Sequence, residues 1–254
     1  MSELAVSTVR RAAPRGTRIA RQARFEAGTL LRNGEQLLVA IILPLLAMLG
    51  LWRASVPDLG GRRIDVVVPG VLALAVASTA FTGQAITTAF DRRNGVLRLL
   101  GTSPLGRDGL LGGKVLAVAG VLGIHLLTLA AIGLALGWRP ELAGLLPGVI
   151  TLILGAGCFV ALAALIGGLL RAEAVLAVAN LLWVLFLGLG LLLPTSVLPG
   201  PLAMLARLLP SGALGDGARH ALLDGGWPLA EWAVLLVWGV LAAALATRFF
   251  RWSD

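Results

Sequence analysis

The sequence predicts an all-α polytopic membrane protein with six transmembrane helices, an N-terminal amphipathic interfacial helix and a partly re-entrant segment before the last span. Of its 254 residues, 58% are hydrophobic and only 13% are charged, whereas soluble domains carry about 25% charged residues. Several apolar runs have or approach the roughly 20 residues needed to cross a bilayer. Little of the chain therefore remains for a soluble domain.

The first 36 residues are expected to form a cytosolic tail followed by an amphipathic helix. A loose segment rich in Ser, Thr, Arg and Pro leads to about Thr17, after which apolar residues recur at helical spacing and seven arginines lie between Arg10 and Arg32. A basic amphipathic helix of this kind lies in the membrane interface. The alternative is a solvated basic tail. The apolar positions are Ile19, Ala23, Ala27 and Leu30.

Residues 37–254 are expected to form one six-helix transmembrane domain. The region 194–228 begins with three prolines and continues with leucines at helical spacing, but its apolar stretches are too short to span. We expect it to form one or two short re-entrant helices on the outer side, with a plain outer loop as the alternative. The predicted spans are 37–52, 66–90, 115–138, 142–170, 174–193 and 229–249.

The distribution of basic residues predicts that both termini are cytosolic. With that orientation, 15 of the 21 basic residues are cytosolic and six, among them Arg207 and Arg219, lie on the outer face. This bias is the one that membrane proteins show, and it explains the net charge of +8 without nucleic acid. Five of the seven tryptophans fall near predicted span ends, where indole rings prefer to lie. They are Trp52, Trp138, Trp227, Trp232 and Trp252.

The polar segment 91–114 is the most informative part of the chain, because it interrupts two apolar spans and carries five basic residues. Its end superficially resembles a phosphate-binding loop. That motif needs a glycine where this chain has Asp108 and a Ser or Thr where it has Val115. The segment therefore does not predict nucleotide binding.

The same segment combines a basic pair, a glycine, spaced leucines, a Thr-x-Pro-Leu turn and a closing Gly-Lys. Its residues are Arg92, Arg93, Gly95, Leu97, Leu100, Thr102, Pro104, Leu105, Arg107 and Lys114. This arrangement resembles the first cytosolic loop of type-2 ATP-binding-cassette (ABC) export permeases, the group that includes daunorubicin-exporter-like membrane subunits. The amphipathic N-terminus, six spans and re-entrant segment extend the resemblance over nearly the whole chain. Many members carry Glu shortly before the glycine, whereas here the nearest acid is Asp91.

The residues of this segment suggest a docking element. Gly95 can start a short helix with an apolar face, and Pro104 ends it. Such a helix can occupy a groove on a protein partner, or the basic loop can lie on anionic headgroups. The residues alone do not decide between these two, and the family resemblance favours coupling to an ATPase.

Four polar residues within or beside the spans are candidates for a substrate path or for interhelical contacts. Gln84 and Asn180 are amides expected in mid-span, His125 is an isolated ionisable residue in a span, and Glu231 lies near the start of the last span. Polar residues at such depths are functional candidates, but each is also explained by a hydrogen bond between helices. One histidine without a second nearby does not predict a haem or metal site.

The resemblance implies the membrane permease subunit of an ABC exporter in the bacterial cytoplasmic membrane, handling a hydrophobic or amphiphilic substrate. It implies two copies of a soluble ATPase that bind ATP and Mg²⁺, a homodimer or a heterodimer with a related permease, and contact with lipids. The chain itself is expected to have no cofactor, no metal and no catalytic residue. The alternatives are a stand-alone secondary transporter or channel and a membrane-assembly factor.

Overall fold

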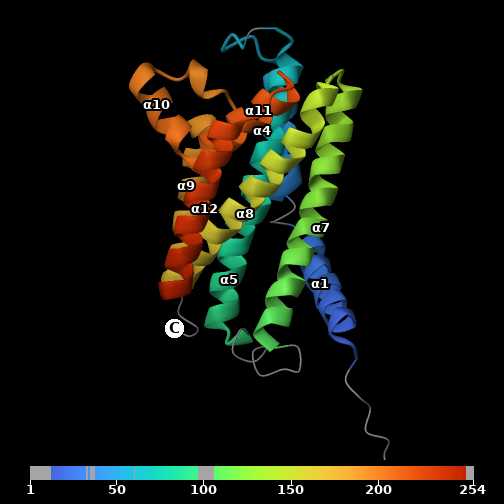
Figure 1. The fold of residues 1–254 in the computed structure, drawn as a ribbon, viewed down its shortest axis with the longest axis vertical. Helices are drawn as coiled ribbons and strands as arrows, with labels where there is room; N and C mark the ends of the chain where they lie inside the picture. The colour runs from blue at the N-terminus through green and yellow to red at the C-terminus, as the bar shows by residue number, and fades with distance from the viewer. Residues whose placement is uncertain (1–12, 33, 35–37, 60, 97–105, 250–254) are drawn as a thin grey trace, which may run out of the picture.

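The computed structural model describes residues 13–32, 34, 38–59, 61–96 and 106–249, and all regular secondary structure within them is helical. The helices run along one elongated bundle (Figure 1). They are α1 (Arg15–Arg32), η1 (Leu38–Ile42), α3 (Leu43–Arg53), α4 (Arg63–Ala77), η2 (Ser78–Gly83), α5 (Gln84–Arg93), α7 (Gly106–Ala135), η3 (Leu142–Gly144), α8 (Leu145–Leu169), α9 (Ala172–Phe186), η4 (Leu187–Leu191), η5 (Thr195–Val197), α10 (Gly200–Leu208), α11 (Pro210–Leu222) and α12 (Leu229–Phe249).

The axis of the bundle is a single long helix made of α4, η2 and α5, which continues without a break over Arg63–Arg93. Every residue from Ile64 to Ala85 is buried. A helix that is apolar on all sides is stable only when it is surrounded. Helices α3, α7, α8 and α11 pack against α4, and α8 and α9 pack against α5.

Within the described part of the chain, five helical segments are long and apolar enough to cross a membrane, namely Arg63–Arg93, Gly112–Ala135, Leu142–Leu169, Ala172–Leu191 and Leu229–Phe249. They overlap five of the six predicted spans. The remaining predicted span, 37–52, corresponds to a shorter apolar helix, Ala40–Arg53. At 1.5 Å per residue this helix rises only about 21 Å, against a hydrocarbon core of about 30 Å.

Most of the described residues in the polar segment 91–114 are helical and do not form a loop. Helix α5 continues to Arg93 and α7 begins at Gly106, so Lys114 lies well inside a helix. The sequence placed these boundaries at the first and last charged residues, but charged side chains extend a helix readily when they find partners within the bundle. Gly112 and Gly113 are tolerated in α7 because Ile19 and Gln22 of α1 pack over them.

The region 194–228 forms η5, α10 and α11, and α11 lies inside the bundle against α4, α8 and α12. Arg219 was counted among the outer-face cations, but only 5% of it is exposed. Its guanidinium donates to Val66 O at 3.3 Å, Gly190 O at 3.1 Å and Leu191 O at 2.8 Å. It also pairs with Asp216 at 3.1 Å. A charge count could not detect this, because the acceptors are backbone carbonyls.

Arg219 joins α11 to the central helix and to η4 at the point where the helical backbone of η4 breaks. Gly190 has a φ of 98°, so the carbonyls at this break have no helical partner and accept from Arg219 instead. Burial lowers the pKa of Arg219 to about 10, and the neighbouring Asp216 opposes that shift. The guanidinium is therefore charged at neutral pH.

Replacing Arg219 with Met is expected to destabilise the protein by about 3–5 kcal/mol, because three backbone carbonyls lose their side-chain donor and Asp216 loses its cationic partner, keeping only its bonds from Thr195. Arg219→Lys keeps the charge but not the planar set of donors, so the stability of this variant should lie between that of Arg219→Met and that of the wild type. The loss of stability is measured by heating the detergent-solubilised protein and recording the fraction that stays monodisperse at each temperature. The control is Arg207→Met on α10, whose exposed side chain makes one 3.3 Å bond to Thr195. Equal melting of the two Met variants would contradict the assignment.

Candidate functional site

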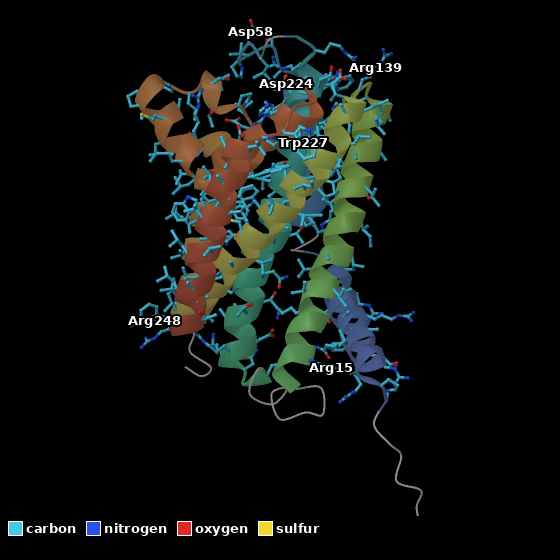
Figure 2. The ribbon with its side chains drawn as sticks, in the orientation of Figure 1. Arg15, Asp58, Arg139, Asp224, Trp227 and Arg248 are labelled. Carbon is cyan, nitrogen blue, oxygen red and sulfur yellow. The ribbon has the colours of Figure 1, made fainter. Side chains whose placement is uncertain are left out.

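The predicted coupling residues that the structure describes gather at one end of the bundle, around the end of α5. Figure 1 shows the end of α5, the start of α7, α1 and the end of α12 together at this end. Arg15 and Arg248 mark it in Figure 2, with Asp58, Arg139 and Asp224 at the opposite end. Helix α1 and the last turn of α12 thus lie on the same side.

Arg92 is directed into the protein and is only 3% exposed. Its guanidinium donates to Gly168 O at 2.6 Å and also to Leu170 O. These carbonyls belong to the last turn of α8 and the residue after it, where helical acceptors lose their intrahelical donors and a cation is favourable. Arg92 therefore caps α8 and attaches α5 to it.

Arg93 forms an ion pair with Glu173 in the first turn of α9. The two side chains are 50% and 67% exposed. An exposed pair of this kind contributes about 0–1 kcal/mol. The pair nevertheless places a basic and an acidic group side by side on the surface of this end of the bundle.

Lys114 of α7 connects three helices. Its ammonium lies 2.9 Å from Asp91 of α5 and 3.9 Å from Glu26 of α1. Gln22 Nε2 in turn donates to Glu26 Oε1 at 3.1 Å. The face of α1 that carries these polar groups packs along α7, while Phe25 is 72% exposed.

Gly95 lies directly after the end of α5, and the next residue, Val96, is helical again. Its φ is 69°, and its N–H donates to Arg92 O at 3.0 Å while Asn94 N–H donates to Phe90 O at 2.9 Å. A left-handed glycine just beyond a helix closes the last carbonyls. Gly95 therefore sets the direction in which the chain leaves α5.

The other predicted coupling residues lie beyond what the structure shows. Arg107 belongs to the first turn of α7, but its side chain is outside the described part. The remaining members of the motif are outside the described residues altogether. They are Leu97, Leu100, Thr102, Pro104 and Leu105.

The four polar candidates in the spans do not form one site. His125 shares a 3.1 Å hydrogen bond with Thr79 of the central helix, and both are buried. Gln84 is buried at the start of α5, and of the four only this residue lines the large cleft found among the described residues. Asn180 is exposed on α9, and Glu231 lies 3.8 Å from His220 of α11.

Glu26 and Glu173 were not singled out from the sequence. Glu26 had a detectable signal, since it lies on the same face as Ala23 and Leu30 and interrupts an apolar stripe. No signal in the sequence could have identified the backbone carbonyls that accept from Arg92. Among the described residues, no group of three or more His, Cys, Asp and Glu side chains is placed to hold a metal ion.

The two neighbouring arginines should behave differently when replaced. Arg92→Met removes buried bonds from a charged donor, each worth about 1.5–3 kcal/mol, and should lower thermal stability at any ionic strength. Arg93→Met should cost less than about 1 kcal/mol, and that cost should vanish in high salt. Melting curves at low and high salt compare them. A salt-dependent loss for Arg92→Met, or equal losses, would show that Arg92 does not cap α8.

Comparison with known proteins agrees with this arrangement. The family described as "ABC-2 family transporter protein" matches residues 64–248, well over half of the chain. No curated protein matches the sequence. The resemblance to type-2 ABC permeases predicted from the segment 91–114 is confirmed, and the chain, a multi-pass membrane protein by its apolar helices, belongs to the ABC-2 transporter family.

Proposed function

We propose that this chain is the membrane subunit of an ABC exporter, driven by a separate ATPase that docks at the end of the bundle formed by α1, the end of α5 and the start of α7. The observation that carries the proposal is the set of contacts made by Asp91, Arg92 and Arg93. Three consecutive residues attach the end of α5 to Lys114 of α7 on one side and to α8 and α9 on the other, and Lys114 in turn reaches Glu26 of α1. The adjoining residues 97–105 carry half of the ten motif residues.

The contacts assign different roles to the motif residues. Arg92 is buried and hydrogen-bonded within the subunit, so its role is to transmit displacement from the loop to α8. Arg93 and the leucines of 97–105 are the proposed surface for the ATPase. Basic groups at such a surface steer an acidic partner.

In this proposal the chain works as a dimer in the cytoplasmic membrane, with the same subunit or a related permease, above two ATPase copies. The basic residues of α1 and of the α5 end give this side of the bundle its positive charge, which is the charge expected of the cytosolic side. ATP and Mg²⁺ bind the partner in this proposal. ATP-driven closure of the ATPases pushes the α5 end, and the exported substrate is hydrophobic or amphiphilic.

Gly95→Ala tests the coupling role. Alanine in the left-handed region costs about 1–2 kcal/mol, and no atom of the described residues lies within 4 Å of the added methyl group. The variant should therefore redirect the chain beyond α5 without disturbing packing, and should weaken ATPase association about fivefold or more. Tagged protein purified from native membranes, with co-purifying ABC-type ATPase quantified, measures this.

Gly61→Ala is the matched control, because Gly61 also has a positive φ (49°), also has open space around it, and lies between α3 and α4 at the opposite end. Gly95→Asn should restore binding, since Asn tolerates the left-handed region. If no ABC-type ATPase co-purifies with the wild type, the exporter proposal fails. If Gly95→Ala and Gly61→Ala retain ATPase equally, the docking site is elsewhere.

A further inference from the structure

Helices α7 and α8 are consecutive, but they diverge from their short connection and leave a cleft between them. Helix α7 packs against α1 and α4, whereas α8 packs against α5, α11 and α12. Figure 1 shows the two helices together at one end of the bundle and well apart at the other, with α5 between them. The cleft has a volume of about 880 Å³.

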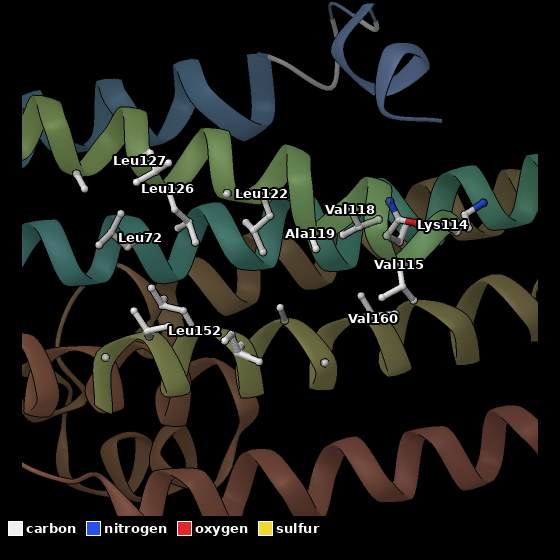
Figure 3. A pocket seen from close by; sticks show the side chains of 18 of the residues that line it. Leu72, Lys114, Val115, Val118, Ala119, Leu122, Leu126, Leu127, Leu152 and Val160 are labelled. Carbon is white, nitrogen blue, oxygen red and sulfur yellow. The ribbon is translucent and has the colours of Figure 1, made fainter. Parts of the chain in front are cut away.

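The walls of the cleft are apolar along its length. Figure 3 shows side chains of α7 and α8 facing each other across it, with Lys114 at one end. Gly123 on α7 and Gly157 on α8 line it, and a methyl group added to either would meet no atom within 4 Å. The central helix forms the floor, where Gln84 and Thr88 add polar groups near the charged end.

The described side chains at the charged end of the cleft carry a net negative charge. The charged side chains that line the cleft, among the described residues, are Glu26, Asp91 and Lys114. Two carboxylates thus face one ammonium, and each of the three side chains is 14–27% exposed. The exposed arginines of α1, Arg21 and Arg24, do not line it.

We propose that this cleft binds a hydrophobic organic cation, with its apolar body between α7 and α8 and its positive charge beside Glu26 and Asp91. The inference rests on the proposed function, because it names the class of cargo. The volume falls within the roughly 300–1,000 Å³ of small-molecule sites, which are apolar with a few placed polar groups. Poor solvation within the cleft strengthens the attraction between the cation and the excess carboxylate.

Two other occupants fit the cleft less well. The phosphate of an anionic lipid would meet two carboxylates, with Lys114 already 2.9 Å from one of them. A transmembrane helix of a second copy is a cylinder about 10 Å wide and 30 Å long, far larger than the cleft. Its apolar side chains would also leave the excess carboxylate without a partner.

Tetraphenylphosphonium and tetraphenylborate provide the test, since they match in shape and apolar surface and differ in the sign of their charge. Binding of each is measured by equilibrium dialysis against the full chain in phosphatidylcholine nanodiscs, without ATPase. The phosphonium should bind saturably and more tightly than the borate. Equal or tighter borate binding, or phosphonium binding no greater than to empty nanodiscs, would overturn the proposal.

Two variants locate the site. Gly123→Leu fills the cleft and should abolish phosphonium binding, whereas Gly120→Leu on the same helix, also with open space but outside the cleft, should not. Glu26→Gln removes the excess charge and leaves the Lys114–Asp91 pair, so it should weaken phosphonium binding about fivefold and should not weaken borate binding. Unchanged phosphonium binding in either Gly123→Leu or Glu26→Gln would refute the site.

Phosphonium binding and ATPase co-purification are separate measurements, so the cleft assignment and the proposed function can fail independently. If an ABC-type ATPase co-purifies with the chain but the phosphonium does not bind, the cleft assignment fails and the exporter proposal stands. If the phosphonium binds but no ATPase associates, the cleft is a binding site and the exporter proposal fails. A phospholipid retained in the cleft that the phosphonium does not displace also overturns the cleft assignment.

Discussion

The contacts made by Asp91, Arg92 and Arg93 hold one whole end of this bundle together. Successive residues on a helix point in directions about 100° apart, so three in a row can reach neighbours on different sides. Here they reach Lys114 of α7, the last turn of α8 and Glu173 of α9. Because the same segment leads into 97–105, a load on that loop reaches α5 directly at one end, as it reaches α7 at the other.

The opposite end of the bundle is held by different chemistry. Asp65 at the start of α4 accepts from the backbone N–H of Arg139 at 3.0 Å, and Arg62 donates to Gly137 O. These bonds fix the connection between α7 and α8, and Arg219 fixes α11 and η4 nearby. Most of the acceptors there are backbone carbonyls, which cannot choose another partner by changing rotamer.

Hydropathy and charge in the sequence were sufficient to predict the helical class and five of the six predicted spans as long apolar helices, whereas the family was predicted from the motif of the segment 91–114. They were not sufficient for its limits, because Lys114 looks like a loop residue until Asp91 and Glu26 are seen beside it. They also failed for Arg219, whose main acceptors are carbonyls exposed by the break at Gly190. A sequence pattern shows which side chains are charged or apolar, but the helical position of Lys114 and the burial of Arg219 both depend on where the fold places their partners.

The two walls of the cleft are not equally free to move relative to α5. The α8 wall is attached to α5 by buried bonds from Arg92 to carbonyls, and breaking them would leave a charge and its acceptors buried without partners. The α7 wall is attached to α5 by the Lys114–Asp91 ion pair, in which a ligand cation can take the place of the ammonium. A displacement of α5 thus carries α8 with it, while a cation bound by Asp91 competes directly with Lys114. The α7 wall is the side on which the charged end of the cleft can open.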